Sequence, residues 1–216
     1  MTLPLRLVAG AVLLFTAMIA LGFAVNAGWF RAFDIVVSNM LNLRRGFSPD
    51  WLILAMQAIS WIGGGLQRYI MVVLLTVALW RWWGWRAGLA MGLTTLVSAF
   101  TSDTLKVLFA RVRPELVMHL DAVSSPAYPS GHSANAAVVY ILFIMLVPQA
   151  RHSLWQLTAA ILIVLTGLSR IMLGVHWPTD VIGGWLLGAA FAMLCAAIIA
   201  QRERTRLGPL SSALAP

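Results

Sequence analysis

The sequence predicts an all-α integral membrane protein: a bundle of six transmembrane helices with an interfacial or re-entrant helical segment between the first and second. Of its 216 residues, 61% are hydrophobic and only 10% are charged, with a mean hydropathy of +0.87, whereas soluble domains carry about 25% charged residues. Apolar runs near the ~20 residues that a bilayer crossing requires alternate with polar segments. This composition excludes a soluble enzyme, a disulfide-rich secreted module and a low-complexity chain. The single cysteine, Cys195, excludes an intrachain disulfide.

The first apolar run extends from about residue 7 to residue 30. A cleaved signal peptide is the alternative, because Val25-Asn26-Ala27 resembles a cleavage site of small residues, but the length of the run favours an uncleaved anchor. Within the mixed segment 31–67, the apolar stretch 51–62 is short for a crossing and ends at three glycines, so we expect interfacial or re-entrant helices there. The remaining spans are predicted at residues 69–85, 87–109, 133–147, 154–173 and 178–200, within one membrane-embedded domain that covers residues 1–216.

Six spans place both termini on the same side of the membrane, and the distribution of arginine favours the cytoplasm for that side. The cations on this side are Arg6, Arg81, Arg86, Arg151, Arg202, Arg204 and Arg206. The opposite side carries Arg31, Arg44, Arg45 and Arg68, together with four more cations that could belong to a functional site. If those four are also counted as topology signals, the two sides carry nearly equal numbers of cations. The net charge of +8 is spread between apolar runs, so it predicts a topology signal and no nucleic-acid partner.

Polar residues gather between positions 102 and 180, beside predicted spans, where each one is costly to place. Lys106 and Arg113 are seven residues apart, so a continuous helix would bring both to one face as an anion site. The alternative to an anion site is that the two cations extend to lipid headgroups at the membrane interface. The segment Tyr128-Pro129-Ser130-Gly131-His132 then opens the fourth span with a turn whose free N–H groups favour an anion, unless it only caps the helix.

A third polar cluster, Ser169-Arg170, His176 and Asp180, surrounds the start of the sixth span. A neutral imidazole can act as a nucleophile, and a carboxylate four residues later can fix its tautomer, although the two could also form a surface capping pair. Because two spans separate the second cluster from the third, all three clusters can meet on one side of the membrane. This set suits a phosphoryl group, whereas its carboxylates are too few for magnesium and its histidines too few for zinc, so we expect no metal and no other cofactor.

The three clusters together resemble a known signature. Lys106 with Arg113-Pro114, then Pro129-Ser130-Gly131-His132, then Ser169-Arg170 with His176 and Asp180 follow the order and spacing of the type 2 phosphatidic acid phosphatase family over about 75 residues. No signature position departs from the pattern, and the six-span plan extends the resemblance to most of the chain. Vanadium haloperoxidases share the signature, but those proteins are soluble.

The resemblance implies a role for each signature residue. His176 would attack the phosphorus and form a phosphohistidine, Asp180 would orient His176, and His132 would protonate the leaving lipid oxygen. Family members work without a metal, because cations stabilise charge on the phosphate oxygens. The groups implied to hold those oxygens are Lys106, Arg113, Ser130, the backbone N–H of Gly131, and Arg170.

The remaining polar residues of this region are not expected to take part in catalysis. Asp103 is expected to pair with Lys106 on the helix. Residues that flank the site and could touch a headgroup are Arg111 and Glu115. His119 and Asp121 are expected to be solvated in the polar loop, and a position on the opposite face is expected for His152.

The expected function is a lipid phosphatase of the plasma membrane (the inner membrane in bacteria), with its active site facing the periplasm or exterior. Undecaprenyl diphosphate is the first candidate substrate, followed by phosphatidylglycerol phosphate and phosphatidate. A lipid A phosphatase or a lipid-to-lipid phosphotransferase is the alternative, since either would keep the same intermediate. An anion transporter is the non-enzymatic alternative, against which the His176, Asp180 and His132 set argues. The expected partners are the lipid substrate and membrane lipids, with no obligate protein partner.

Overall fold

The computed structural model describes residues 2–213, and their side chains except those of residues 203 and 206–213. Arg206, one of the cations counted for topology, therefore lies outside the described side chains. The described range is helical and has no strand, which confirms the all-α prediction. Its elements are α1 (Leu3–Asn26), α2 (Arg31–Leu41), α3 (Asp50–Gly63), α4 (Gly65–Trp83), α5 (Trp85–Phe109), α6 (Gly131–Leu146), the 3-10 helix η1 (Pro148–Arg151), α7 (Ser153–Met172) and α8 (Pro178–Ala213).

Three helices of the described range, α1, α7 and the Pro178–Arg202 part of α8, are each long and apolar enough to cross a membrane. The pair α3 and α4 meets this criterion together and is bent by 54° at its break, where the sequence predicts a break after residue 62. α6 is apolar but has only 16 residues. The length and composition of the helices therefore support three or four crossings in an integral membrane protein.

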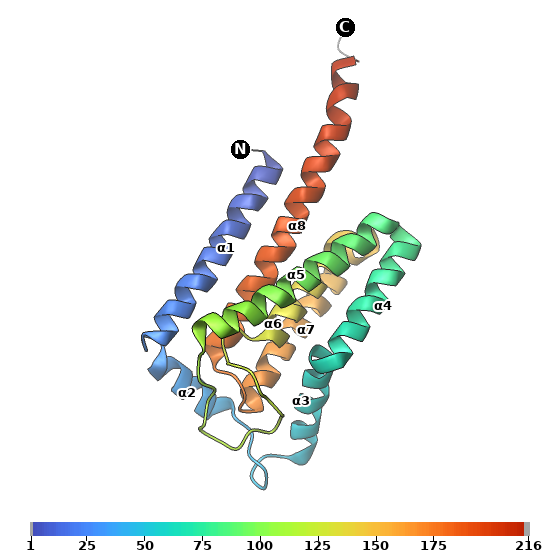
Figure 1. The fold of residues 1–216 in the computed structure, drawn as a ribbon. Helices are drawn as coiled ribbons and strands as arrows, with labels where there is room; N and C mark the ends of the chain where they lie inside the picture. The colour runs from blue at the N-terminus through green and yellow to red at the C-terminus, as the bar shows by residue number, and fades with distance from the viewer. Residues whose placement is uncertain (1, 214–216) are drawn as a thin grey trace.

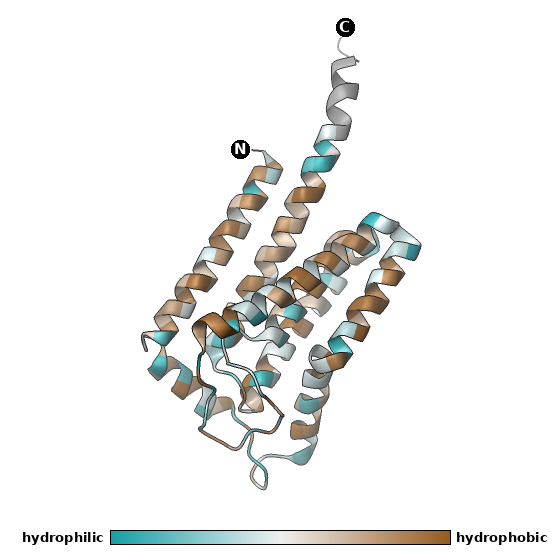
Figure 2. Ribbon diagram, viewed as in Figure 1, coloured by the Kyte–Doolittle hydropathy of each residue, from teal (hydrophilic) through white to brown (hydrophobic). Residues whose placement is uncertain are grey.

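Hydrophobic residues recur along α1, α4 and α5 (Figure 2), and many of them are exposed on the outside of the bundle. Large exposed side chains on these helices include Leu13, Leu74 and Phe100. In water such a surface would be unfavourable, whereas lipid chains solvate it without penalty. This surface therefore agrees with a location inside the bilayer.

The long helices run side by side, and the long connection between α5 and α6 lies at one end of the bundle (Figure 1). α8 packs along α1 and α6, α4 packs along α5, and α6 contacts α5 and α7 as well. α2, α3 and the loop 110–130 cover one end, and the N-terminus and the last turns of α8 lie at the other end (Figure 1). We call these the loop end and the terminal end.

Glycines allow α8 to approach the start of α6 closely. A Cβ atom on Gly184 would overlap the carbonyl oxygen of Ser130, and one on Gly188 would overlap that of Ala134. Small residues spaced four apart are a common means of bringing membrane helices into backbone contact. The N-terminus of α6 is thereby held against the first turns of α8, and this contact positions the polar groups at the loop end.

Candidate active site

The centre of the loop end is a buried histidine–aspartate pair. His176, in the connection between α7 and α8, is 2% exposed, and Asp180, in the first turn of α8, is fully buried. Nδ1 of His176 lies 3.3 Å from Oδ2 of Asp180, which also accepts a hydrogen bond of 2.8 Å from the backbone N–H of Trp177. The carboxylate thus fixes the ring with a proton on Nδ1 and leaves Nε2 with a lone pair.

The lone pair of His176 faces a guanidinium group. Nη1 of Arg113 lies 3.2 Å from Nε2 of His176 and donates to the carbonyl oxygen of Val175 over 2.6 Å. Burial, followed by the charges of Arg113, Arg170 and Lys106, lowers the pKa of His176 well below its usual range. The imidazole is therefore neutral at neutral pH, which is the form that can attack an electrophile.

Asp180 is also part of a larger charge network, which corrects one sequence prediction. Arg111, expected to touch a headgroup, instead pairs with Asp180 through Nη1 and with Asp34 through Nη2, the latter at 2.6 Å. Asp34 lies on α2, is 1% exposed, and accepts further hydrogen bonds from the backbone N–H and the hydroxyl group of Thr179. Sequence spacing could not reveal this contact, because Asp34 is separated from Arg111 by 77 positions. The network ties α2 to the carboxylate that orients His176.

Lys106 and Arg113 meet at the site, but not for the reason that the sequence suggested. α5 ends at Phe109, and Ala110 adopts a left-handed conformation with φ of 45°, so the helix does not continue to Arg113. Instead the loop turns back, and Ser125 joins the two cations. Its hydroxyl oxygen is 3.5 Å from Nζ of Lys106, and its carbonyl oxygen accepts a bond of 2.8 Å from Nε of Arg113. The expected pair between Lys106 and Asp103 is present at 3.4 Å.

Arg113 faces no carboxylate among its hydrogen-bond partners in the described part of the chain. Burial is the main cause that lowers its pKa to about 10, and the charge of Arg170 adds to the effect. At neutral pH the guanidinium therefore keeps its charge. A cation held by carbonyl oxygens beside the His176 ring is available to an anionic ligand.

The N-terminus of α6 adds a partial positive charge to the site. Ser130 is the N-cap residue, and its hydroxyl oxygen accepts from the backbone N–H of Ser133 over 3.5 Å, while its own N–H donates to the carbonyl oxygen of Asp180 over 2.9 Å. The space beside Cα of Gly131, where another residue would carry its Cβ, lies 3.3 Å from Nζ of Lys106. A helix N-terminus facing a lysine ammonium group favours an anion between them.

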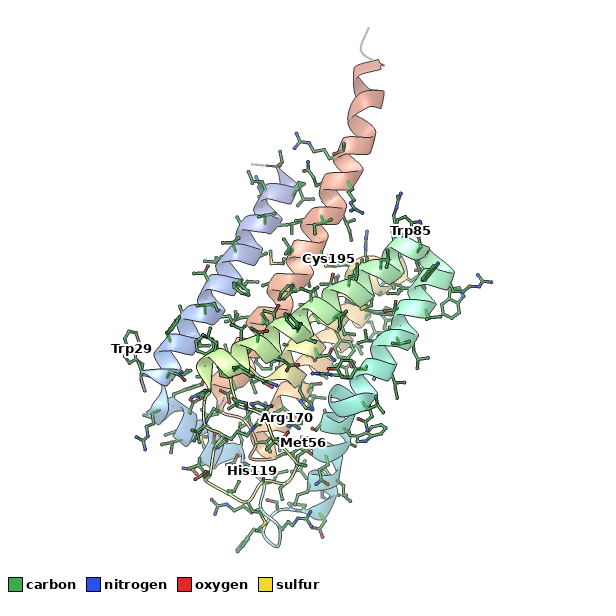
Figure 3. The ribbon with its side chains drawn as sticks, viewed as in Figure 1. Trp29, Met56, Trp85, His119, Arg170 and Cys195 are labelled. Atoms are coloured by element: carbon green, nitrogen blue, oxygen red, sulfur yellow. The ribbon has the colours of Figure 1, made fainter. Side chains whose placement is uncertain are left out.

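Arg170 is 1% exposed and lies at the loop end of α7 (Figure 3). Its Nη1 donates to a carboxylate oxygen of Asp121 and to the hydroxyl group of Ser60 on α3. Asp121, expected to be solvated, is therefore an ion-pair partner of Arg170, although its side chain is still 34% exposed. Burial raises the pKa of Asp121, but hydrogen bonding and the charge of Arg170 outweigh burial and hold this pKa below its usual range.

His132 is in the first turn of α6 and lies against the break between α3 and α4. A Cβ atom on Gly64 would overlap Nε2 of His132, so only glycine leaves room for the ring in this arrangement. Gly63 is also close, with its Cβ position 3.5 Å from Cδ2 of the imidazole. Gly63 and Gly64, two of the three glycines that the sequence places at the end of a helix, therefore also form one wall of the site.

The remaining polar loop residues lie outside this cluster. Nε2 of His119 lies 2.7 Å from the carbonyl oxygen of Pro114, and Glu115 is exposed. His152 is exposed and precedes α7 at the terminal end, on the opposite face as expected. Within the described residues, no three His, Cys, Asp or Glu side chains form a group with the geometry of a metal site.

Four residues of the site were missed by sequence reasoning: Asp34, Ser60, Gly64 and Arg68. The available signal was an acidic residue in an otherwise apolar segment for Asp34 and a triple glycine for Gly64. Arg68 was counted only as a topology signal. Its Nη1 lies 3.5 Å from the Cβ position of Gly131, on the same side as Lys106.

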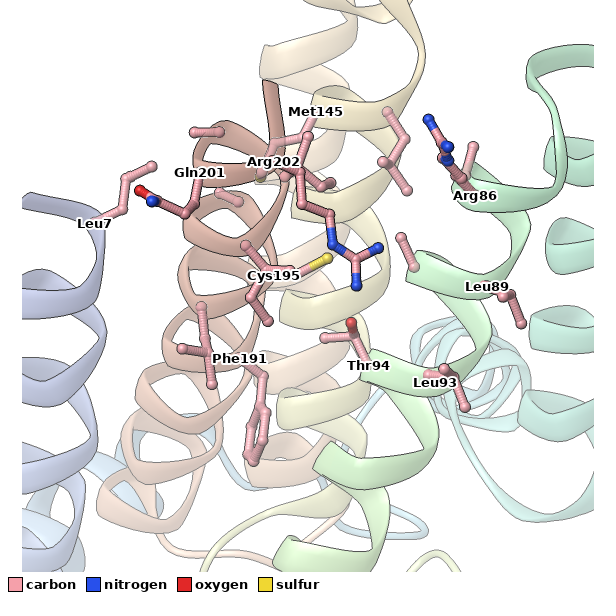
Figure 4. A pocket seen from close by; sticks show the side chains of 18 of the residues that line it. Leu7, Arg86, Leu89, Leu93, Thr94, Met145, Phe191, Cys195, Gln201 and Arg202 are labelled. Carbon is pink, nitrogen blue, oxygen red and sulfur yellow. The ribbon is translucent and has the colours of Figure 1, made fainter. Parts of the chain in front are cut away.

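A large cavity lies elsewhere, at the terminal end of the bundle (Figure 4). It measures about 1260 Å³ and is lined mainly by apolar side chains of α1, α5 and α8, with Arg86, Arg151 and Arg202 among its polar residues. Cys195 is part of its wall (Figure 4). No residue of the predicted signature lines it, so size alone does not identify the functional site.

Known proteins resemble this chain over most or half of its length. Phosphatidylglycerophosphatase B of Bacillus subtilis (strain 168) is 32% identical over 181 residues, which cover 81% of this chain and 87% of that protein. An undecaprenyl-diphosphatase of Sulfolobus acidocaldarius is 28% identical over 115 residues, which cover 50% of this chain and 53% of that protein.

A solved structure shares the fold. The crystal structure of a transmembrane PAP2 type phosphatidylglycerolphosphate phosphatase from Bacillus subtilis matches with a TM-score of 0.78 and 29% identity, covering 88% of this chain and 96% of that chain. The family model described as PAP2 superfamily matches residues 83–204, more than half of the sequence. The chain therefore belongs to the PAP2 superfamily.

Proposed function

We propose that this protein hydrolyses a lipid phosphate or diphosphate through a phosphohistidine formed on His176. Membership of the PAP2 superfamily supports a metal-independent lipid phosphatase. The observation that carries the proposal is the placement of His176, whose Nδ1 faces Asp180 while Nε2 faces Arg113. A bound phosphate would accept hydrogen bonds from Arg113 and bring its phosphorus within reach of the Nε2 lone pair.

The reaction has two steps that restore the enzyme. In the first, Nε2 of His176 bonds to phosphorus while the bond between phosphorus and the leaving oxygen breaks, and protonated His132 gives its proton to that oxygen. The phosphate beside His132 stabilises the protonated imidazole before transfer. In the second step, His132 takes a proton from water, the resulting hydroxide attacks phosphorus, and the P–N bond breaks to release inorganic phosphate.

Cations and N–H dipoles would stabilise the transition state. Lys106, Arg113 and Arg170 come from α5, the 110–130 loop and α7, and the Ser130–Gly131 turn adds the N-terminus of α6. These groups are held before substrate arrives, so little reorganisation opposes the increase of charge on the equatorial phosphate oxygens. In this proposal Asp121 gives up part of its contact with Arg170 to the phosphate.

The preferred substrate is undecaprenyl diphosphate, with phosphatidylglycerol phosphate and phosphatidate as further candidates. The two relatives named above are a phosphatidylglycerophosphatase and an undecaprenyl-diphosphatase. We further propose that residues 1–216 form one domain that crosses the membrane six times, with α1, α4, α5, α6, α7 and α8 as the crossings. Arginines at the terminal end favour cytoplasmic termini, which puts the loop end at the periplasmic or exterior face.

The proposal is tested with the purified protein in detergent, a chelator in the buffer, and a panel of four lipids. These are a polyprenyl diphosphate, phosphatidylglycerol phosphate, phosphatidate and lipid A. We expect release of inorganic phosphate, and acid-labile, base-stable labelling of the protein when the transferred phosphate is radioactive. A panel without phosphate release, or activity that returns only with a divalent metal, would contradict the proposal.

A further inference from the structure

The site contains a fourth cation that the signature does not include. Arg68 is in the first turn of α4, and its Nη1 lies 3.5 Å from the Cβ position of Gly131, which is itself 3.3 Å from Nζ of Lys106. The hydroxyl group of Ser102 is also near, at 3.7 Å. The oxygen of Ser102 is buried, and none of the described residues forms a hydrogen bond with it. Arg68, Lys106 and Ser102 therefore face one point beside the N-terminus of α6.

Within the part of the chain that the structure describes, no acid balances the charge of Arg68, since no carboxylate forms an ion pair with it. Its Nη2 donates to the hydroxyl group of Tyr69 over 2.6 Å, and the guanidinium carbon lies 4.6 Å from the centre of the Tyr69 ring. Its Nε is buried and has no hydrogen-bond partner among residues 2–213 with described side chains. Tyr69 thus orients the guanidinium without neutralising it, and two like charges near one point favour an anion between them.

Arg68 also marks the border between the charged site and an apolar groove. A groove of about 330 Å³ runs between α4 and α5, and Arg68 and Tyr69 line it together with Val72, Val73, Leu93 and Leu96. A lipid whose terminal phosphate is at His176 and whose chain lies along this groove would pass Arg68 with the phosphate nearest the chain. The order along the molecule would be apolar chain, Arg68, then the signature residues.

We propose that Arg68 binds the lipid-side phosphate of a diphosphate and so makes the enzyme prefer lipid diphosphates to lipid monophosphates. This inference rests on the proposed function and adds the residue that sets the preference for a diphosphate. In the diphosphate reaction, His176 bonds to the terminal phosphorus and the bond from that phosphorus to the bridging oxygen breaks. The electron pair leaves with the lipid monophosphate, whose negative charge Arg68 stabilises as the bond breaks.

A lipid monophosphate uses the site differently. Its leaving group is an alkoxide, which needs the proton of His132, and it has no second phosphate for Arg68 to bind. The phosphate leaving group of a diphosphate is far more acidic and depends less on that proton. Arg68 therefore matters more for a diphosphate and His132 more for a monophosphate, and this difference can be measured.

The test compares farnesyl diphosphate with farnesyl phosphate, which share one apolar chain and differ by a single phosphate group. For Arg68→Gln we expect kcat/KM for the diphosphate to fall about 10- to 100-fold more than for the monophosphate, the typical effect of losing a charge-assisted hydrogen bond. Arg68→Lys should keep most of the preference, because it retains the charge. For His132→Ala the larger loss should fall on the monophosphate.

Arg81→Gln is the matched control, because Arg81 is an exposed arginine at the other end of the same helix. It should leave the ratio of the two kcat/KM values unchanged. An equal loss on both substrates in Arg68→Gln, or no loss on the diphosphate, would overturn the inference and leave the proposed function standing. Wild-type protein that hydrolyses neither compound nor any other lipid phosphate would contradict the proposed function itself.

Discussion

The two ends of the bundle both carry arginine, but they use it differently. At the terminal end, exposed Arg86, Arg151 and Arg202 surround a cavity with apolar walls. At the loop end, Arg111 and Arg170 are largely buried and bonded to carboxylates. A buried guanidinium is stable only when its desolvation is offset by partners. The presence of cations therefore does not define a phosphate site, whereas their fixed orientation does.

The reason for the difference is the packing around each end. The terminal end has an apolar core in which Leu79, Met91 and Leu142 are fully buried among neighbouring helices. The loop end has an apolar cluster of its own, which includes Leu43, Met56 and Leu173, and adds to it buried hydrogen bonds from Arg111 to Asp34 on α2 and to Asp180 on α8. Interactions of this kind tolerate little displacement, so we expect activity to be far more sensitive to substitutions there.

The largest difference between the ends is expected for two histidines. His176→Ala should lower kcat by about 10⁴-fold or more, because it removes the proposed nucleophile. His152→Ala, at the terminal end, should leave kcat unchanged. The measurement is phosphate release in detergent, combined with a binding assay that should show retained affinity for substrate in His176→Ala. Substantial turnover in that variant would refute the phosphohistidine.

The next effect concerns the carboxylates behind His176. Asp180→Asn should lower kcat by about 10³–10⁴-fold, because an amide no longer fixes the productive tautomer. Asp34→Asn should lower it by about 10²-fold, since Arg111 then holds Asp180 less well and a displacement of about 1 Å has an effect of that size. Asp50→Asn, an exposed acid on α3, is the control. A normal kcat in Asp34→Asn would show that the buried network contributes to the stability of the fold and not to catalysis.

A smaller loss is expected at the glycine break. Gly64→Ala should displace the His132 ring, because the added Cβ overlaps Nε2, and should lower kcat for a lipid monophosphate by up to about 10²-fold. The same substitution in a His132→Ala background should add little, since the group that it displaces is already missing. Additive losses in this double-mutant cycle would mean that Gly64 acts by some route other than His132.

The pH dependence gives a finer test. Since the pKa of His176 is lowered by burial and neighbouring cations, the neutral ring persists as the pH falls below 6.5. The loss of kcat/KM that comes from protonating the nucleophile should therefore begin below this pH. ¹⁵N spectra of histidine-labelled protein should show one ring, absent in His176→Ala, that is neutral at pH 6. A charged His176 at pH 6 would contradict the assignment.

The smallest effect is expected at the cavity of the terminal end. Arg202→Gln and Arg86→Gln should change kcat/KM by no more than about twofold, as is typical of exposed positions away from a site. The assay is the same phosphate release. A large loss in either variant would show that the two ends are coupled and would end the contrast between them.

The sequence alone determined the helical membrane class and the residues of the signature. Both follow from local information. Long apolar runs are stable in a bilayer, and a polar group beside such a run is costly to place and therefore indicates a functional site. The convergence of Lys106, Arg113, Ser130, Arg170 and His176 on one end followed from counting the spans between them. The helical phase used for Lys106 and Arg113 was wrong, because α5 ends at Phe109 before the second cation is reached.

The tertiary structure alone decided which groups support those residues. Asp34, Ser60, Gly64 and Arg68 lie in the segment between the first long helix and the middle of α4, where the sequence indicated only interfacial helices. Their contacts join positions as much as 145 residues apart. No local pattern encodes such contacts, because they depend on how whole helices pack, and here the close approach of α8 to α6 and the bend between α3 and α4 bring them together.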